Sequence, residues 1–576
     1  MSDDKQPGLL GLEDIQHWTR ILGQAQQMML EAGVDPRLAD ALFPVVPGLN
    51  DPATVTRVAD FWADSLALWQ RFLVPAPAGA ATDAGSAPTD KRFAAPQWRD
   101  NPTFDFIRQS YLTIANHLLR GVAEMPGLDP RQRAQLRFAT QNMVDALSPS
   151  NFPMTNPEVI ERTIETRGEN LLKGLRNMLA DLQKGQVTHT DATAFEVGRN
   201  LATTPGKVIH RTPLFELIQY APTTADVLAT PLVIFPPWIN RFYVLDLTPE
   251  KSFVRWAVDQ GITVFMVSWK SADASMAHVT WDDYVLAQAE AIEVVRGQLA
   301  VPAVHAIGYC VGGTTLAAAL ALLTARGEAS MVASATFFTA QVDFEHAGDL
   351  LNFVGDDQLK LIESLSPEGY LDGRYMAATF NLLRGRDLIW NYVANNYLMG
   401  RDYVPLDLLH WNGDTANLPS KWHLSYLTDL YRDNLLVRPG ALSVDGVPVD
   451  LGSVTTPAYV QAGRDDHIAP AESVWKLLHH LKGSVRFVLA ASGHIAGVVN
   501  PPAANKYHYW TNDALVSTLD EFVAGAVETK GSWWPDWVAW LRALDAAITP
   551  ATGARQPGKG PHPALPDAPG TYVLER

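Results

Sequence analysis

Six residues near the middle of the chain, Gly308-Tyr309-Cys310-Val311-Gly312-Gly313, place a cysteine between closely spaced glycines. The short apolar run before them, 303–307, predicts a buried strand, and the run after them, 314–326, consists of good helix formers. A strand, a tight turn with small residues and a helix form the setting of a nucleophile elbow, which holds its central side chain at the edge of a sheet. This pattern predicts that Cys310 is a nucleophile.

Cys310 also has a simpler interpretation. A free cysteine is most often a small buried hydrophobic residue, and a Gly-x-Cys-x-Gly string alone would favour that interpretation. The predicted strand and helix on either side favour the nucleophile instead. Cys310 is the only cysteine in the chain, so an intramolecular disulfide is excluded and a reducing compartment is expected.

An acid and then a histidine follow two later predicted strands. The two motifs are Asp465-Asp466-His467 after the strand 457–461 and Ser492-Gly493-His494 after the strand 485–489. In folds with a nucleophile elbow, the nucleophile, acid and base occur in this chain order on loops that follow strands. We therefore predict a triad of Cys310, Asp466 and His494, in which His494 takes the thiol proton and Asp466 orients the imidazole.

Neighbouring residues leave alternatives for each partner. Asp465 could be the acid, which would leave Asp466 to cap the following helix. His467 could be the base, but a histidine that directly follows the acid would need an unusual loop, so we interpret it as a supporting residue. His305 lies on the predicted strand before the elbow, and we expect it in the core.

Two backbone amides are candidates for an oxyanion hole. The amide of Val311, one residue after the nucleophile, supplies the first donor in a nucleophile elbow. The second comes from the loop after an earlier strand, here 231–235, and in that loop we favour the amide of Ile239 over that of Trp238. The pair His479-His480 falls on a predicted helix without cysteine, histidine or carboxylate neighbours that could complete a metal site, so we predict no metal.

Length and charge exclude several classes of protein. A chain of 576 residues with 47% hydrophobic residues predicts two or three globular units. Its net charge of −17 argues against a nucleic-acid-binding surface. The first residues lack the basic and apolar regions of a signal peptide, and no apolar run reaches membrane-spanning length. We therefore expect a cytoplasmic protein without a transmembrane segment.

The pattern along the chain predicts four regions. They are an N-terminal helical region (1–74), a flexible Pro/Ala/Gly-rich linker (75–90), a helical N-terminal domain (91–200) and an α/β domain (201–576). The first region has amphipathic patterns at 13–32 and 52–74, and the helical domain has predicted helices at 103–124, 130–147 and 157–183. The α/β domain begins with strand-like segments at 207–211 and 215–220.

Strands and helices then alternate. Strands are predicted at 231–235, 263–269, 303–307, 331–338, 457–461 and 485–489, and helices at 249–260, 282–299, 314–326 and 512–527. Apolar strands that alternate with helices indicate a mostly parallel sheet covered on both faces, and the elbow makes it an α/β-hydrolase fold. The alternation stops between 340 and 450, which is too long for a loop, so we expect a mostly helical inserted lid there.

A cysteine nucleophile favours acyl transfer over hydrolysis. A serine acyl-enzyme is an oxyester, whereas a cysteine acyl-enzyme is a thioester and keeps nearly all the activation of a thioester substrate. Cysteine therefore suits an enzyme that passes an acyl group from coenzyme A to an alcohol, and a lid would help by excluding water.

Several strings resemble the polyhydroxyalkanoate synthases. They are the elbow itself, the stretches 236–246, 267–270, 273–276, 280–284, 387–392, 411–414, 465–468 and 492–497, and the tail Trp533-Trp534-Pro535. The resemblance covers about 90 to 576 and is to class I synthases, which work without a second subunit and favour short-chain substrates. Cys310, Asp466 and His494 are similar to that family's nucleophile, acid and base. Asp246 matches a family aspartate near the active-site loop, to which we give a supporting role.

The resemblance implies an acyltransferase that polymerises (R)-3-hydroxyacyl-CoA, with 3-hydroxybutyryl-CoA as the expected substrate, into polyester with release of CoA. No cofactor is implied beyond the CoA that the substrate carries. It also implies a homodimer that associates with the polymer granule in the cytoplasm. Trp238 departs from family members that carry a smaller residue there, which leaves the pocket width open. A thioesterase or polyester depolymerase on the same fold, and a non-catalytic granule protein, are the alternatives.

Overall fold

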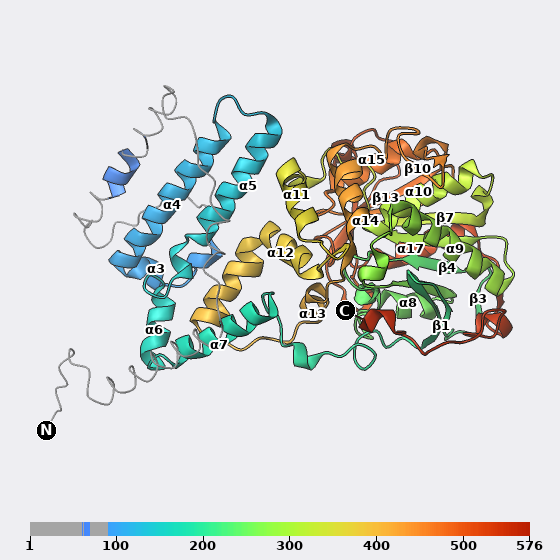
Figure 1. Cartoon of the computed structure of the whole chain (residues 1–576), viewed down its shortest axis with the longest axis horizontal. Coiled ribbons are helices and arrows are strands. Elements are labelled where there is room, and N and C mark those ends of the chain that lie inside the picture. The colour runs from blue at the N-terminus through green and yellow to red at the C-terminus, as the bar shows by residue number, and fades with distance from the viewer. Residues whose placement is uncertain (1–59, 61–62, 69–89, 576) are drawn as a thin grey trace. The chain divides into compact units, whose positions relative to one another are not determined.

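The computed structural model describes residues 60, 63–68 and 90–575. The amphipathic pattern 13–32 lies outside these residues, as do most of 52–74 and all of the predicted linker except Asp90. The chain divides into two compact units (Figure 1). The helical unit comprises the described residues up to His189 together with Ala378–Val404, and the sheet unit comprises Thr190–Ala377 and Pro405–Arg576.

The helices of the helical unit begin at strong capping signals. They are α3 (Gln97–Asp100), α4 (Pro102–Ala123), α5 (Pro130–Ala146), α6 (Pro157–Glu165) and α7 (Glu169–Lys184). The side chains of Asn101, Asp129 and Asn156 accept backbone amides at the starts of α4, α5 and α6, and each of these helices has proline in its first turn. The helices predicted at 103–124 and 130–147 are confirmed.

The single helix predicted at 157–183 is wrong, because it is divided into α6 and α7. Arg167 and Gly168 separate the two helices with φ values of 52° and 87°. A left-handed conformation at two consecutive residues cannot continue an α-helix, and the helical periodicity on both sides concealed this break.

Ten strands form the main sheet of the sheet unit. In spatial order they are β1 (Gly206–Arg211), β2 (Phe215–Tyr220), β5 (Val264–Trp269), β4 (Leu232–Phe235), β6 (Val304–Tyr309), β7 (Val332–Phe338), β12 (Ala458–Gly463), β13 (Val485–Ala490), β14 (His508–Thr511) and β15 (Val527–Lys530). The six strands from β5 to β13 are parallel, and two antiparallel strands extend the sheet at each side. The predicted α/β-hydrolase fold class, with a mostly parallel sheet, is confirmed.

Helices cover both faces of this sheet. Helices α8 (Phe253–Asp259) and α17 (Trp534–Leu544) share one core cluster with Ile307 and Tyr309 of β6. Gly308 faces the other way, toward α10 (Val311–Ala325), which packs against α9 (Trp281–Leu299). Successive side chains of a strand point to opposite faces, so the two helix pairs lie on opposite sides (Figure 1).

The helix predicted at 512–527 is wrong. Only the short helix α16 (Leu519–Gly525) forms within that range. The strand β14 ends just before the range, β15 begins at its last residue, and the two strands pair with each other. Thr518 and Glu521 form a reciprocal capping box, so α16 begins only after Thr518. The helix predicted at 249–260 is likewise shorter, because Ser252 caps α8 at Phe253.

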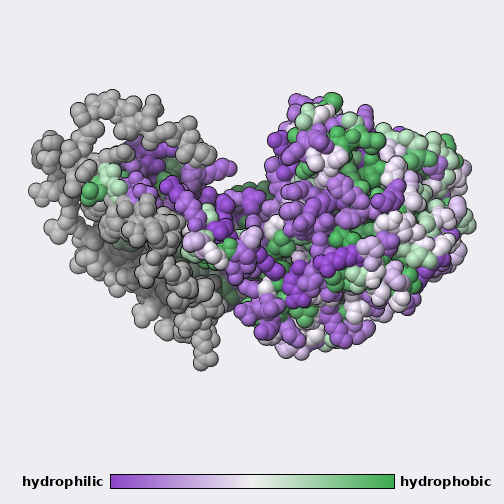
Figure 2. Space-filling view, turned by 90° about the horizontal axis from the view of Figure 1, so that it is seen from above, coloured by the Kyte–Doolittle hydropathy of each residue, from purple (hydrophilic) through white to green (hydrophobic). Residues whose placement is uncertain are grey.

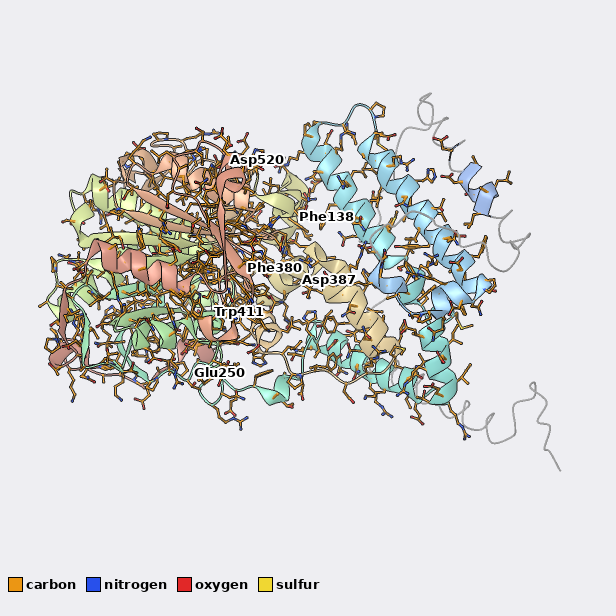
Figure 3. The ribbon with its side chains drawn as sticks, turned by 180° about the vertical axis from the view of Figure 1, so that it is seen from behind. Phe138, Glu250, Phe380, Asp387, Trp411 and Asp520 are labelled. Carbon is orange, nitrogen blue, oxygen red and sulfur yellow. The ribbon has the colours of Figure 1, made fainter. Side chains whose placement is uncertain are left out.

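A largely helical insertion separates β7 from β12, as predicted. Its elements are α11 (Asp356–Ser364), α12 (Gly373–Leu383), η9 (Arg386–Trp390), η10 (Val393–Leu398), α13 (Asp407–Gly413), α14 (Ser420–Ser425) and η11 (Tyr426–Arg432). It does not form one body, because Ala378–Val404 belongs to the helical unit. Phe380 and Asp387 in that segment are labelled in Figure 3.

The visible surface of the sheet unit carries mainly hydrophilic side chains, among which hydrophobic ones form scattered patches (Figure 2). None of the helices in the described part of the chain is both long and apolar enough to cross a membrane.

Candidate active site

Cys310 lies at a sharp turn between β6 and α10. Its backbone has φ 53° and ψ −126°, a conformation that few non-glycine residues adopt. Its amide donates a hydrogen bond of 2.9 Å to the carbonyl of Phe338 at the end of β7. The side chain is half-buried. The turn therefore holds the thiol at the carboxyl edge of the parallel strands, where active sites of such sheets lie.

The glycines of the elbow allow three backbone segments to meet. A methyl group at Gly308 would overlap the backbone of Gly313, and one at Gly312 would overlap the carbonyl oxygens of Phe235 and Pro236. Only glycine fits such close approaches. The first turn of α10 is therefore pressed against the loop that follows β4.

His494 and Asp466 are directly hydrogen-bonded. The Nδ1 atom of His494 lies 2.7 Å from Oδ2 of Asp466, and both residues are buried. The other carboxylate oxygen, Oδ1, accepts the amides of Ile468 at 2.8 Å and Ala469 at 2.9 Å. The carboxylate is thus fixed by its own loop and can fix the orientation of the imidazole.

The remaining candidates occupy other positions. Asp465 is exposed to solvent, whereas Asp466 is buried against His494. His467 is half-buried in the same loop. His305 is buried on β6 with Nδ1 2.7 Å from the Ser334 hydroxyl, and burial lowers its pKa to about 4. It is a core residue, as expected.

The charges around His494 favour its protonated form. Burial alone would lower the pKa of this imidazole, but the charges of Asp466 and Cys310, with hydrogen bonds to both, raise it well above its usual value. The Cys310 thiol therefore lies near the His494 imidazole. The structure brings together Cys310, His494 and Asp466 in the order of a relay.

The loop that carries His494 is held by three aromatic side chains. The Tyr309 hydroxyl donates to the carbonyl of His494 at 2.9 Å. The indoles of Trp533 and Trp534 donate to the carbonyls of Gly497 and Val498 at 2.8 and 2.9 Å. All three side chains are buried. No motif predicts this role for Tyr309, although it directly precedes the nucleophile, and Trp533 and Trp534 stand out in the sequence only as part of a string that resembles the family.

The two predicted oxyanion donors lie on neighbouring segments. Val311 is the first residue of α10, and an amide at this position has no acceptor within its own helix. Within the described ranges, the carbonyl of Ile239 accepts the amide of Ala416 at 3.0 Å, and its own amide has no backbone acceptor. Their joint role as an oxyanion hole stays a prediction.

Asp246 and Trp238 each contact residues outside the triad. Asp246 is buried and accepts the hydroxyls of Thr204 at 2.5 Å and Ser252 at 2.6 Å. Burial raises the pKa of its carboxyl. The Trp238 ring stacks on Tyr284 with ring centres 4.1 Å apart and meets Trp422 of α14 edge-on. Trp238 thus joins the loop after β4 to the insertion.

The insertion also reaches the nucleophile. Tyr426 and Tyr431 of η11 are buried, and burial together with the nearby charge of Cys310 raises the pKa of both phenols. Tyr431 accepts a hydrogen bond of 3.2 Å from Gln341. Two tyrosines of the insertion therefore lie near the nucleophile.

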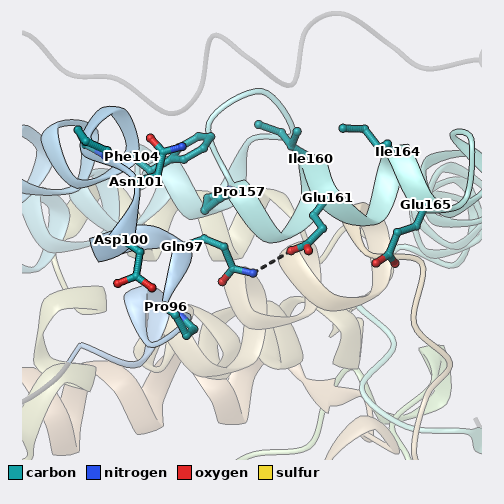
Figure 4. Close-up of a pocket in the computed structure, with 11 residues that line it drawn as sticks. Pro96, Gln97, Asp100, Asn101, Phe104, Pro157, Ile160, Glu161, Ile164 and Glu165 are labelled. Atoms are coloured by element: carbon teal, nitrogen blue, oxygen red, sulfur yellow. Dashed lines mark hydrogen bonds between the residues drawn. The ribbon is translucent and has the colours of Figure 1, made fainter. Parts of the chain in front are cut away.

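A separate cavity of about 750 Å³ lies in the helical unit among α3, α4 and α6 (Figure 4). Its wall combines apolar side chains with carboxylates, and a hydrogen bond of 2.8 Å joins Gln97 to Glu161 across it. The 11 residues drawn include neither cysteine nor histidine. No cluster of possible metal ligands occurs in the described ranges.

Two family models match the chain. Residues 89–257 match the N-terminus of poly-β-hydroxybutyrate polymerase (PhaC), and residues 231–501 match the α/β hydrolase fold. The chain is 46% identical over 543 residues to the poly(3-hydroxyalkanoate) polymerase subunit PhaC of Cupriavidus necator, an alignment that covers 92% of this chain and 91% of that one. The chain belongs to the poly(3-hydroxyalkanoate) polymerase family.

Other members of the polymerase family are similar over most of their length. The PhaC subunit of Rhizobium meliloti is 45% identical over 88% of this chain and 84% of its own. Poly(3-hydroxyalkanoate) polymerase 2 of Ectopseudomonas oleovorans is 37% identical over 85% and 87%. The resemblance drawn from the motifs is therefore confirmed at the level of the polymerase family, a transferase family on an α/β-hydrolase fold.

Proposed function

We propose that the chain polymerises (R)-3-hydroxyacyl-CoA into polyester through a thioester on Cys310. The observation that carries this proposal is the buried hydrogen bond between Asp466 and His494 beside the Cys310 thiol. Membership of the polymerase family supports the substrate class, because its members are named for this polymer.

In the first step, the Cys310 sulfur attacks the thioester carbonyl carbon of the substrate. The carbon–sulfur bond to CoA breaks, and His494 delivers the proton that it took from the thiol to the leaving CoA sulfur. The Val311 and Ile239 amides are the proposed donors to the oxygen that becomes negative in the tetrahedral intermediate. Asp466 stabilises the imidazolium that forms.

In the second step, a 3-hydroxyl group attacks the acyl-cysteine. Cys310 and Asp466 both raise the pKa of His494, and acylation removes the contribution of Cys310. The imidazole is therefore more readily neutral in the acyl-enzyme and can accept the hydroxyl proton. An ester bond forms, the bond to sulfur breaks, and the thiol is restored. Tyr426 and Tyr431 of the insertion lie near Cys310, and we infer that they limit the entry of competing water.

The deciding experiment supplies purified full-length protein with (R)-3-hydroxybutyryl-CoA. Free CoA is followed with a thiol reagent, and chloroform-soluble polymer is weighed against free 3-hydroxybutyrate. CoA release with accumulating polymer supports the proposal. CoA release with free acid alone would mean that water is the acceptor and that the chain is a thioesterase or depolymerase.

Two substitutions at the nucleophile sharpen this test. Cys310→Ala should abolish CoA release while the melting temperature stays within a few degrees of that of the unaltered protein. Cys310→Ser would form an oxyester in place of the thioester, so any residual turnover should yield a larger share of free acid. Retained turnover in Cys310→Ala would contradict the assignment of the nucleophile.

The remaining parts of the proposal concern substrate length and assembly. We assign short-chain substrates to this chain from its resemblance to class I synthases, and we place it as a homodimer at the surface of the cytoplasmic polymer granule. Comparison of CoA release from C4 and C8 hydroxyacyl-CoA tests the first point. Sedimentation of the protein with and without substrate, and its recovery with isolated granules, test the second.

A further inference from the structure

The loop that follows β4, residues 236–241, is held from two directions within the sheet unit. On one side, the insertion binds its backbone. Ala416 donates to the carbonyl of Ile239 at 3.0 Å, and Trp411, labelled in Figure 3, donates its indole N–H to the carbonyl of Arg241 at 2.6 Å. At the start of the loop, the indole of Trp269 donates to the carbonyl of Pro236 at 2.9 Å.

On the other side, residues 571–575 bind the loop through one buried arginine. Arg241 is 3% exposed, and its guanidinium donates Nη1 to the carbonyl of Tyr572 at 3.3 Å and Nη2 to the carbonyl of Glu575. Its Nε lies 3.7 Å from a carboxylate oxygen of Asp414. A guanidinium presents donors in a fixed fork, so contacts to three groups fix both its position and the backbone from which it projects.

Residues 571–575 are themselves fixed by a second buried charge. Glu216 on β2 is fully buried, and its carboxylate accepts the amides of Thr571 at 2.9 Å and Tyr572 at 3.1 Å and the hydroxyl of Thr571 at 3.0 Å. A buried carboxylate with these contacts is costly to displace, because the charge would lose its partners. The strand β2 thus positions residues 571–575, which in turn position Arg241.

We propose that Arg241 and residues 571–575 form a clamp that sets the geometry of the oxyanion loop. The inference rests on the proposed function only in assigning the Ile239 amide as an oxyanion donor. Ile239 lies two residues before Arg241, and its carbonyl is bound to Ala416, so the direction of its amide depends on both anchors. Arg241 is a positioning residue, since none of its described contacts is with the triad.

The test uses Arg241→Lys, which keeps the charge and removes the fork. The matched control is Arg555→Lys, because Arg555 is also a buried arginine that donates to two backbone carbonyls, those of Leu228 and Ala229, at the start of the segment leading to β4. Two rates are measured in the full-length protein: CoA release from 3-hydroxybutyryl-CoA, and alkylation of Cys310 by iodoacetamide. Alkylation needs the thiolate but forms no tetrahedral oxyanion.

We expect Arg241→Lys to lower kcat for CoA release by about 10- to 100-fold, less than the loss of a whole oxyanion donor, with KM and the alkylation rate changed less than about threefold. Arg555→Lys should leave the ratio of the two rates unchanged. If Arg241→Lys lowers both rates equally, or neither, the clamp is not specific to the oxyanion loop and the inference fails.

Hydrogen exchange gives a readout that does not depend on turnover. Peptides that cover 236–243 should exchange faster in Arg241→Lys, while peptides that cover 304–313 should not change. Unchanged exchange at 236–243 would overturn the inference even if activity fell. The test of the clamp compares CoA release with alkylation of Cys310, and CoA is released whether the acyl group passes to a hydroxyl group or to water. Free acid in place of polymer would therefore contradict the proposed function but leave the test of the clamp valid.

Discussion

Asp466 shares its carboxylate between two tasks: one oxygen contacts His494 Nδ1 at 2.7 Å, and the other accepts the amides of Ile468 and Ala469. The second set of contacts holds the carboxylate in place whatever the charge on the imidazole. The orientation of His494 is therefore built into the loop after β12 and does not depend on substrate.

Asp466→Asn tests this division of tasks. The amide keeps a similar shape but lacks the charge that stabilises the imidazolium and the correct tautomer, so CoA release should fall by about 10³- to 10⁴-fold. Asp465→Asn is the matched control, since Asp465 is exposed, and it should change the rate less than about threefold. Equal losses in steady-state CoA release would mean that the acid has been wrongly assigned.

His494→Gln and His467→Gln distinguish the two histidines. Loss of the base should lower kcat by at least about 10³-fold, because the thiol then has no proton acceptor. His467→Gln should cost far less, as His494 is the histidine bonded to Asp466. The measurement is kcat for CoA release, supported by circular dichroism to confirm that both variants are folded. A larger loss in His467→Gln would reverse the assignment.

Gly312→Ala should destabilise the sheet unit. The added methyl group would overlap the carbonyl oxygens of Phe235 and Pro236, and overpacking of this kind costs about 1–3 kcal/mol or more. Gly297→Ala is the control, because Gly297 lies in α9 with open space around it and alanine should stabilise the helix by about 0.5–1 kcal/mol. Urea unfolding of both variants gives the comparison, and equal midpoints would show that the contact at Gly312 can relax.

Acid should destabilise the sheet unit through two buried histidines. Burial lowers the pKa of both His305 and His423 to about 4, against about 6.5 in an unfolded chain. Between these pKa values the folded state binds fewer protons than the unfolded state. The contribution of the two histidines to the free energy of unfolding is therefore complete above pH 6.5 and is lost as the pH falls toward 4. Each histidine contributes up to about 3 kcal/mol to the free energy of unfolding at neutral pH.

The variant His423→Phe isolates one of these contributions. His423 is buried beside Trp422 in α14, where a phenyl ring has a similar volume. Unfolding free energies measured between pH 7 and pH 5 should fall less steeply in the variant than in the unaltered protein. Parallel curves would show that His423 does not contribute to the acid sensitivity.

The central sheet and the triad could be predicted because their signals are local. Apolar runs of five to eight residues become strands, and Asp466 and His494 lie on the loops that follow two of them. The break at Arg167 and the hairpin of β14 and β15 escaped prediction, since backbone conformation and strand pairing depend on neighbours that helical periodicity does not reveal.

Contacts between distant residues that belong to no motif could not be predicted. Arg241 and Glu575 are 334 positions apart, and nothing in their local sequence indicates that one binds the other. The same holds for Trp533 and the loop after β13, which are linked through a single indole N–H. Such contacts decide the exact placement of the site, while the motifs decide only its chemistry.

Because the helical unit consists of two separate stretches of sequence, it constrains the order in which the two units fold during synthesis of the chain. Asp145 on α5 and Asp181 on α7 bind Arg386 and Tyr397, which belong to the later stretch. A ribosome that adds about 5–20 residues per second reaches that stretch roughly 10–40 s after it has passed His189. During that interval the first helices lack their partners while β1 to β7 are being synthesised, so the N-terminal helices are completed after much of the sheet and not before it.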